Sequence, residues 1–495
     1  MGHVSAEAKS GPGEGGRHPG PFGAMLAALL LLGLLATPAS AFATPTWLLP
    51  SSKLSDEAQS AREPQIAVDE AGDAVAVWKR SNGTNFVIEA ATSPAGKGWS
   101  LPSKLSDGTQ NAERPQIAVD AAGDAVAVWA RSNSTHLVVE AATHPTGGGW
   151  SLPSKLSDEA QSAFNARVAI DAVGDAVAVW ERSNGTHEVI EATRHPAGGN
   201  WSAPNKLSDE AQTAAEPQVA VDQAGDAVAV WDRFNGTNQV VEAAAHPAGG
   251  GWSVPSKLSD EAQSAGEPQI AVDQAGDAVA VWERSNGPNF VVEAAAYDAA
   301  PPRLKAVSIP SDGRVGMPLS FSSTAIDAFS PNLQTSWSFG DRATASGPSV
   351  THAYAAPGSY EVALKVLDGV GNATSKTQTV TISPPARAAR IVKVKGGKVL
   401  LRLSCPAAAA ETPCRGTAKL STARDKKPIV LASGIFQLRS GQQANVALKL
   451  NPKAKRLLVI PSRRLRAKLS GDGLQARSVI LVAAGKGRGH RAHLM

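Results

Sequence analysis

Five near-copies of one unit fill the first half of this chain and limit its fold more than any other feature. The copies begin at Trp47, Trp99, Trp150, Trp201 and Trp252, so the period is 51 residues, or 52 for the first copy. A fixed period of this length is typical of propellers and solenoids, in which each repeat buries its apolar surface against the next. The region 42–300 is therefore expected to be one repeat architecture.

Each repeat is expected to contain four short strands. In the copy that begins at Trp99, these are residues 115–120, 125–129 and 137–142, followed by 150–157 from the start of the next copy. Glycine-containing turns separate the first three strands, as in antiparallel hairpins. Four antiparallel strands per repeat make a propeller blade. Because Ala and Val occupy alternate positions on both faces, both faces of each sheet are expected to be covered.

The phase of the repeat predicts how the array ends. Residues 47–55 correspond to the fourth strand of the other copies, whereas the last copy stops after its third strand, 290–296. The N-terminal strand can therefore complete the last sheet, which closes a ring and removes two sheet edges. We predict a closed five-bladed β-propeller and a monomer. An open solenoid, with the same pairing made between two chains, is the alternative.

The run Val-Asp-x-Ala-Gly-Asp-Ala-Val-Ala-Val-Trp resembles the Asp-box hairpin of sialidase-like propellers. That resemblance implies the architecture but not the activity, because sialidase-like hydrolysis needs a Tyr nucleophile and the repeats hold only Tyr297, at their end. One arginine recurs in every copy, and these five are the candidate ligand-binding residues: Arg80, Arg131, Arg182, Arg233 and Arg284. Five equivalent environments fit repeated binding or a structural pairing with the recurring glutamates, whereas catalysis needs groups in unequal environments.

No catalytic residue is therefore assigned, and the chain is expected not to be an enzyme. If one site were catalytic, it would lie where the repeat is broken, and the non-repeated residues are Phe164, Asn165, Arg167, Arg194 and Phe234. Paired aspartates such as Asp69 and Asp73 can hold Ca²⁺, but a turn role is favoured. No metal and no cofactor are expected.

Residues 301–384 resemble a PKD domain. The segments that carry the resemblance are Trp337-Ser-Phe-Gly-Asp341, His352-Ala-Tyr354 and Pro357-Gly-Ser-Tyr360-Glu-Val362. Arg342 departs from the family pattern, which has Gly there. The resemblance implies an Ig-like β-sandwich that acts as a spacer or as a contact module for carbohydrate or protein.

Residues 387–484 show alternating apolar runs and are expected to form a small basic β-sandwich, similar to a domain found at the C-termini of secreted actinobacterial proteins. Cys405 and Cys414, nine residues apart, are expected to form a disulfide. The whole chain is thus predicted to be all-β.

The two ends of the chain suggest export. An apolar run at 24–36 precedes Ala39-Ser40-Ala41, which predicts a signal peptide over 1–41, with translation starting at Met1 or Met25. No later run is long enough to cross a membrane. Residues 485–495 are expected to be a disordered tail. A secreted protein, with possible retention at the cell surface, follows from these features.

Charge divides the chain into two unlike parts. Residues 387–495 carry 24 Lys and Arg but only 3 acids, whereas the remainder carries 24 basic and 41 acidic residues. A basic domain of this kind is expected to contact an anionic envelope polymer, and no specific nucleic acid. The polyanion-contact candidates are Arg463, Arg464, Arg466 and Lys468.

The sequence thus favours a non-catalytic, extracellular or cell-surface protein for binding or adhesion. The propeller would be the recognition or scaffold unit, possible ligands being glycans, and the PKD-like domain would be a spacer. Two alternatives stay open: a glycan-active hydrolase or lyase on a propeller scaffold, and a purely structural surface repeat.

Overall fold

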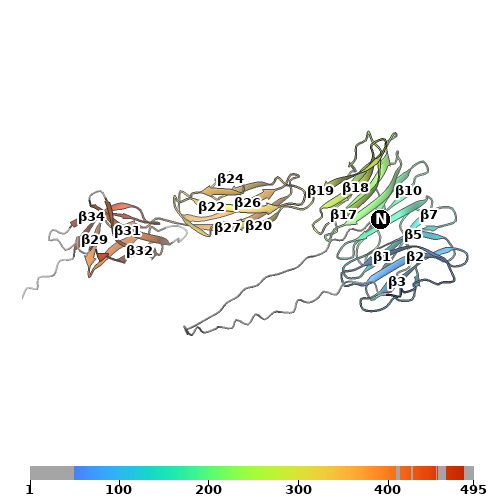
Figure 1. The fold of residues 1–495 in the computed structure, drawn as a ribbon, viewed down its shortest axis with the longest axis horizontal. Helices are drawn as coiled ribbons and strands as arrows, with labels where there is room; N and C mark the ends of the chain where they lie inside the picture. Colours follow the sequence, from blue (N-terminus) through green and yellow to red (C-terminus); the bar gives the residue numbers. More distant parts are fainter. Residues whose placement is uncertain (1–48, 408–412, 425–426, 453, 455–463, 484–495) are drawn as a thin grey trace, which may run out of the picture. The chain divides into compact units, whose positions relative to one another are not determined.

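The computed structural model describes residues 49–407, 413–424, 427–452, 454 and 464–483, and strands dominate throughout them (Figure 1). Within these residues, no helix is long and apolar enough to span a bilayer. The proposed signal peptide and the proposed disordered tail lie outside the described residues.

The repeats form one antiparallel sheet each. The first four sheets have the orders β1-β2-β3-β4, β5-β6-β7-β8, β9-β10-β11-β12 and β13-β14-β15-β16, and the fifth has β17-β18-β19. The first strands are β1 Ala61–Val68, β5 Ala112–Val119, β9 Ala163–Ile170, β13 Ala214–Val221 and β17 Ala265–Val272. The second strands are β2 Ala74–Ser81, β6 Ala125–Ser132, β10 Ala176–Ser183, β14 Ala227–Phe234 and β18 Ala278–Ser285. The third strands are β3 Phe86–Ser93, β7 Leu137–His144, β11 Glu188–His195, β15 Gln239–His246 and β19 Phe290–Tyr297. The fourth are short: β4 Ser103–Lys104, β8 Ser154–Lys155, β12 Asn205–Lys206 and β16 Ser256–Lys257.

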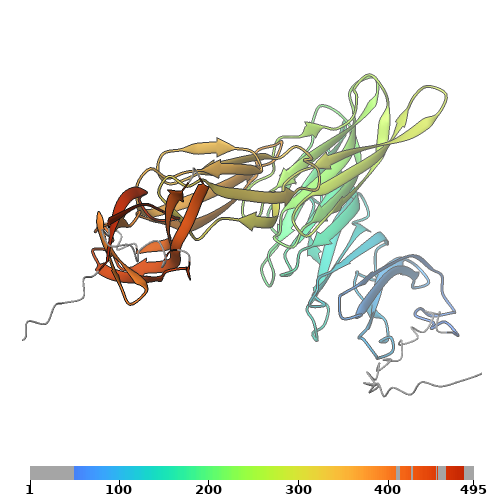
Figure 2. The ribbon, with the colours of Figure 1, turned by 60° about the vertical axis from the view of Figure 1, so that its left-hand side comes forward.

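Neighbouring sheets pack face to face, and the tryptophan of each second strand fills the space between them. Trp129 packs against Val77 and Ile88 of the first sheet, and Trp180 packs in the same way against the second sheet. The second strand β6 is buried from Ala125 to Arg131, so both of its faces are covered, as the sequence predicted. Successive sheets can be followed in Figure 2 from blue to yellow-green. The all-β fold, with repeated four-stranded sheets like those of a propeller, is confirmed.

Among the described residues the predicted closure by the N-terminal strand is not present, and this part of the prediction is corrected. The fifth sheet has three strands, and no described strand pairs with the outer edge of β19. Of the predicted strand 47–55, the described residues 49–55 lie in no strand. The first strand β1 is exposed along nearly all of its length, so no later sheet covers it. Because each repeat contacts only its neighbours, local packing alone does not bring the two ends together.

Residues 303–383 form a β-sandwich of two sheets, with the orders β20-β22-β25 and β21-β27-β26-β23-β24. Its strands are β20 Arg303–Ser308, β21 Asp312–Arg314, β22 Leu319–Ile326, β23 Gln334–Ser338, β24 Thr344–Ser346, β25 Ser349–His352, β26 Gly358–Leu367 and β27 Ala373–Ser383. Trp337 and Tyr354 are fully buried in its core. Arg342, at the position where the PKD pattern has Gly, has φ 74°, which lies in the left-handed region that favours Gly.

In the C-terminal domain, where the sequence predicted a small β-sandwich, the strands belong to one eight-stranded sheet around a hydrophobic core. Its strands are β28 Arg387–Ala388, β29 Ile391–Lys395, β30 Lys398–Ser404, β31 Cys414–Arg424, β32 Lys427–Leu438, β33 Gln443–Lys449, β34 Arg464–Ser470 and β35 Arg477–Ala483. Cys405 and Cys414 form the predicted disulfide, with their Cα atoms 5.5 Å apart. Both cysteines belong to the buried core.

Candidate functional site: an acidic pocket where the repeat is broken

Every first strand carries a β-bulge that holds one residue in a left-handed conformation. The bulge residues are Glu63, Arg114, Asn165, Glu216 and Glu267, with φ between 51° and 54°. A residue other than Gly in this region is strained, and bulges often aim side chains at functional sites. The identity of the bulge residue changes from sheet to sheet, although the surrounding sequence repeats. The repeat is therefore broken at the position where the backbone is most specialised.

The position after the second-strand tryptophan is also unequal. It holds Lys79, Ala130, Glu181, Asp232 and Glu283 in the five copies. Glu181 is 3% exposed, and its Oε1 accepts hydrogen bonds from Asn165 Nδ2 at 2.8 Å and from the Glu216 backbone N–H at 3.0 Å. Burial raises the pKa of the Glu181 carboxyl, and the Glu216 carboxylate adds to the effect. Buried carboxylates without a cationic partner are expected to behave in this way.

Asp232 has the most perturbed environment of these groups. It is 4% exposed. Burial, followed by the charges of Glu216 and Glu181, raises the pKa of Asp232 to about 7. The backbone N–H groups of Ala215 and Glu267 donate hydrogen bonds to its carboxylate and only partly offset that rise. The protonated form of Asp232 is therefore favoured to a much higher pH than that of an ordinary aspartate.

Gly266 leaves space beside the Asp232 carboxylate. A Cβ atom placed on Gly266 would lie 3.0 Å from Asp232 Oδ2. The same repeat position holds Arg62, Glu113, Phe164 and Ala215 in the other copies. In the fifth copy, therefore, no side chain at this repeat position covers the Asp232 carboxylate.

These residues border a pocket of about 350 Å³ between the fourth and fifth sheets. Its charged lining is entirely acidic and consists of Glu216, Asp232, Glu267 and Glu283, joined by Gln239, Ser264 and Phe290. Phe290 is 69% exposed and offers a flat apolar surface. A cationic neighbour lies close by: burial lowers the pKa of the Arg167 guanidinium, and the charges of Glu216 and Glu181 oppose that change. The pocket joins a buried carboxyl with a raised pKa, three further carboxyl groups and an aromatic face.

None of the five non-repeated residues that the sequence singled out lines this pocket, but three of them lie around the nearby Glu181. Asn165 binds Glu181, Arg167 is within the electrostatic reach of Glu181 and Glu216, and Phe164 pairs with Glu181 across β9 and β10. Arg194 lies elsewhere, with Nη2 3.8 Å from Asp175 Oδ2, and Phe234 ends β14 with 45% exposure. Sequence reasoning missed Glu181, Glu216, Asp232 and Gly266, although comparing repeat positions column by column would have found them.

The recurring arginines are engaged inside their own sheets. Arg131 Nε lies 2.7 Å from Glu140 Oε1 on the neighbouring strand, and Arg182 and Arg233 form the same pair with Glu191 and Glu242. Trp129 Nε1 also donates to Glu140 Oε2 at 3.2 Å. This arrangement matches the structural role that the sequence left open, while a ligand-binding role for the five arginines stays a prediction.

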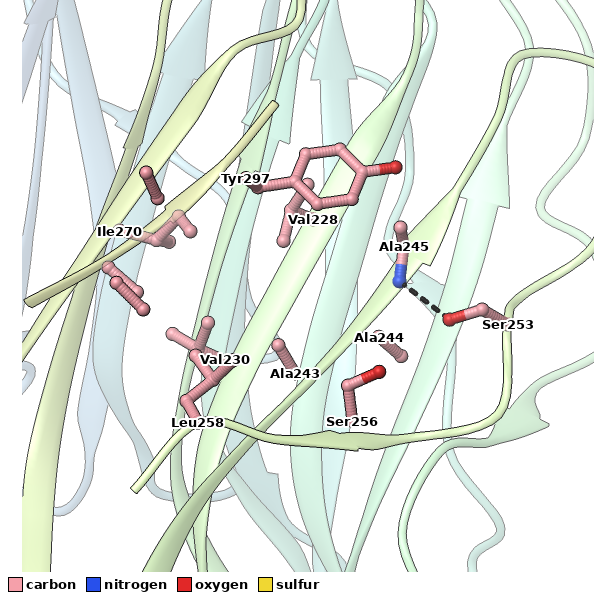
Figure 3. Close-up of a pocket in the computed structure, with 13 residues that line it drawn as sticks. Val228, Val230, Ala243, Ala244, Ala245, Ser253, Ser256, Leu258, Ile270 and Tyr297 are labelled. Atoms are coloured by element: carbon pink, nitrogen blue, oxygen red, sulfur yellow. Dashed lines mark hydrogen bonds between the residues drawn. The ribbon is translucent and has the colours of Figure 1, made fainter. Parts of the chain in front are cut away.

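A second pocket between the fourth and fifth sheets is apolar (Figure 3). It measures about 110 Å³ and is lined by alanine and valine side chains, with Tyr297 beside them. Its polar contact is the hydrogen bond from the Ala245 N–H to Ser253 Oγ, at 3.0 Å. With no charged residue in its lining, it offers no acid–base pair.

Two groups of carboxylates are relevant to metal binding. In the repeats, Asp69 Oδ1 accepts the Asp73 N–H at 2.8 Å, and Asp73 Oδ1 accepts the Ala95 N–H, so these aspartates organise turns. Asp298, which precedes the sandwich domain, and Asp327 and Asp368, which follow β22 and β26 within it, bring carboxylate oxygens within 4.8 Å of one another. Oxygen clusters of this type are the ligands that hard cations such as Ca²⁺ prefer.

The basic residues predicted to contact a polyanion lie on one strand face. Arg464, Arg466 and Lys468 alternate along β34 and are all exposed, while Ala467 and Leu469 face the core. Arg466 and Lys468 line a groove of about 570 Å³ together with Arg390. Arg463 lies outside the described residues.

Comparison with known families identifies the second domain. Residues 299–383 match the PKD domain family. This region holds a PKD domain, as the sequence indicated, with the boundary two residues earlier than expected. A PKD domain and a disulfide are both typical of extracellular proteins. No curated protein matches the chain.

Solved structures similar to the chain include an endo-arabinase from Bacteroides thetaiotaomicron, at 14% identity over 48% of this chain and 93% of that chain, with a TM-score of 0.30. A glycosyl hydrolase from Bacteroides ovatus matches at 14% identity over 48% of this chain and 84% of that chain, with a TM-score of 0.28. A polysaccharide lyase matches at 12% identity over 61% of this chain and 76% of that chain, with a TM-score of 0.30. At these values the likeness concerns the fold.

The expectation that the chain is not an enzyme is contradicted, since the similar structures are described as glycoside hydrolases and a polysaccharide lyase. That expectation was drawn from the recurring arginines and glutamates, whose ion pairs do repeat from sheet to sheet. Glu181 and Asp232, at a position where the sequence does not repeat, lie in unequal environments.

Proposed function

We propose that the protein is a glycoside hydrolase whose active site is the acidic pocket between the fourth and fifth sheets. The observation that carries the proposal is the pair formed by buried Asp232, whose pKa is raised to about 7, and exposed Glu216, whose charge contributes to that rise. Most glycoside hydrolases use two carboxyl groups with separated pKa values, one protonated and one ionised.

In this proposal Asp232 is the general acid. It donates its proton to the glycosidic oxygen as the bond to the leaving sugar breaks. Glu216 is the second carboxylate, which stabilises the developing positive charge and either attacks the anomeric carbon or activates water. Phe290 offers a surface on which a sugar ring stacks.

The charge of the pocket favours hydrolysis over a lyase reaction. A lyase acts on a uronate, whose carboxylate would approach the four acids that line the pocket. Like charges in a partly desolvated site repel one another. Neutral or amino-sugar glycans are therefore the expected substrates.

The test is an assay of reducing ends released from a panel of neutral, amino-sugar and uronate polysaccharides. The variants Asp232→Asn and Glu216→Gln are expected to lose about 10²- to 10⁴-fold in kcat/KM, the usual worth of a general acid or base. Activity of the wild type should fall as the pH rises above about 7, where Asp232 loses its proton. Glu113→Gln, at the repeat position that Gly266 occupies in the fifth copy, is the matched control. Binding without release of reducing ends by the wild type would contradict the proposal.

A separate observation supports a second role for the C-terminal domain. The exposed row Arg464, Arg466 and Lys468 borders a groove, in a domain with almost no acidic residues. We propose that this face holds the secreted protein on an anionic envelope polymer. Such contacts weaken with salt, because charges are screened within about 8–10 Å at physiological ionic strength.

This role is tested by the binding of the full chain to purified cell envelopes across a salt series. The variant Arg466→Glu combined with Lys468→Glu is expected to lose binding, and binding should fall steadily with added salt. The matched control is Lys305→Glu in the PKD domain. Binding that does not respond to salt would contradict this role.

A further inference from the structure

The outer face of the fifth sheet exposes residues that every other sheet buries. Val292 on β19 is 76% exposed, whereas its repeat equivalents are all 0% exposed: Ile88, Val139, Ile190 and Val241. Val279 on β18 is 37% exposed, whereas Val75, Val126, Val177 and Val228 are 5% exposed or less. In the first four sheets this face is covered by the next repeat. The fifth sheet therefore ends the array with a complete but uncovered packing surface.

The first sheet presents the complementary surface. Ala61 on β1 is exposed, whereas its equivalents are 2% exposed or less: Ala112, Ala163, Ala214 and Ala265. Ile66 and Val68, on the same strand, are 61% and 57% exposed. In the other sheets these positions pack on the preceding repeat. The fifth sheet thus exposes the surface that a following repeat would cover, and the first sheet exposes the surface that would pack on a preceding repeat.

The chain also carries the strand that the fifth sheet lacks. In the first and fourth sheets the fourth strand pairs as Glu89 with Lys104 and Glu242 with Lys257, and as Ala90 with Ser103 and Ala243 with Ser256. The N-terminal segment, residues 52–59, has the same sequence as residues 256–263, with Ser52 and Lys53 at the pairing positions. These two residues lie in no strand, and Glu293 and Ala294 have no fourth strand beside them among the described residues.

This segment already rests on the first sheet as the equivalent linkers rest on theirs. Leu54 packs with Ala76 and Trp78, and Arg80 donates to Gln59 as Arg131 donates to Gln110. Its polar groups match open groups of the fifth sheet. Ser106 and Ser259, the equivalents of Ser55, accept the N–H groups of Ile88 and Val241, and the corresponding donor on the fifth sheet is Val292. Unlike the equivalent linkers, this segment has no preceding sheet among the described residues with which it could pair.

We propose that the first sheet and the N-terminal segment of a second copy of the chain dock on the fifth sheet. The contact repeats the four internal interfaces, with Ser52 and Lys53 of one copy as the fourth strand of the other. A contact between two different surfaces is heterologous, so it extends head to tail until a ring closes. It also covers the free edge of β19, which is otherwise open to unspecific pairing. The second copy would stand next to Glu283, at the border of the acidic pocket.

The docking register is tested with two single-cysteine variants, Ser52→Cys and Ala294→Cys, because the native cysteines are already bonded to each other. A mixture of the two is expected to form a disulfide-linked dimer under mild oxidation, and each variant alone is not. The double variant should form linked multimers. A double variant that links only within one chain, with no dimer in the mixture, would show that the chain closes on itself and would overturn the proposal.

The apolar contact is tested by sedimentation velocity over a concentration series. The wild type is expected to shift from one chain to dimers and longer assemblies, and Val292→Glu is expected to abolish the shift. Val292 is exposed, so the variant should still fold. Leu101→Glu is the matched control, since Leu101 is 88% exposed and lies outside the strands, between β3 and β4. A wild type that keeps the mass of one chain at every concentration would overturn the proposal.

Discussion

The repeats contain two sets of buried carboxylates, one paired with arginines and one without a charged partner. Glu140, Glu191 and Glu242 each face an arginine within 2.8 Å, and the arrangement repeats from sheet to sheet. Glu181 and Asp232 are as deeply buried but accept neutral N–H donors, and their pKa values are raised. A buried charge is stable beside a matching charge and shifts its titration without one. Where the repeat is kept, carboxylates hold the sheet together, and where it is broken, they acquire acid–base character.

The largest effect should come from titrating Asp232. A carboxyl whose pKa is raised in the folded state is neutral in both states at low pH, so the fold loses stability as the pH rises from about 4 to about 7 and then stays level. A shift from 3.8 to about 7 corresponds to about 4 kcal/mol at 1.36 kcal/mol per unit. Asp232→Asn should remove most of this fall, measured by urea unfolding at pH 4, 5.5 and 8. Glu283→Gln, at the exposed equivalent position, is the control. An identical pH slope in Asp232→Asn and the wild type would refute the comparison.

A somewhat smaller effect of opposite sign is expected in the paired set. Glu191→Gln leaves Arg182 buried without its carboxylate, and breaking a buried ion pair from one side destabilises by about 3 kcal/mol or more. The free energy of unfolding should fall by that amount at pH 8, where Asp232→Asn gains stability. Glu210→Gln, which removes the more distant and half-exposed partner of Arg182, is the control and should change little. If Glu191→Gln left stability unchanged, the arginine row would be free for the ligand role that the sequence suggested.

The smallest expected effect concerns access to Asp232. Gly266→Ala places a methyl group about 3.0 Å from Asp232 Oδ2, so either the carboxylate or the backbone must move by a few tenths of an ångström. We expect kcat/KM to fall by about tenfold, which is about 1.4 kcal/mol, with unfolding unchanged within about 1 kcal/mol. Glu113→Ala, at the same position in the second copy, is the control. Full activity in Gly266→Ala would place the reacting atoms away from Gly266.

Much of the fold followed from the sequence because it depends on local patterns. The strand positions, the turns, the PKD domain and the Cys405–Cys414 disulfide were all readable from spacing and residue type. The candidate site was only partly readable. Asn165 and Arg167 stood out as departures from the repeat, but Glu181, Glu216 and Asp232 each look ordinary within their own copy. Their shared environment arises because residues far apart in the chain meet across stacked sheets, as in the hydrogen bond from the Glu216 N–H to Glu181.

The sequence by itself determined the five-fold repeat of antiparallel strands and the strand that each repeat contributes to the one before it. Tertiary structure decided two further things: that the first and fifth sheets stay apart, and that unpaired carboxylates gather beside Gly266. Both depend on how one sheet is rotated against the next. Sequence repetition specifies identical interfaces but not the angle through which they turn the chain, and this angle determines which side chains meet and whether the two ends do.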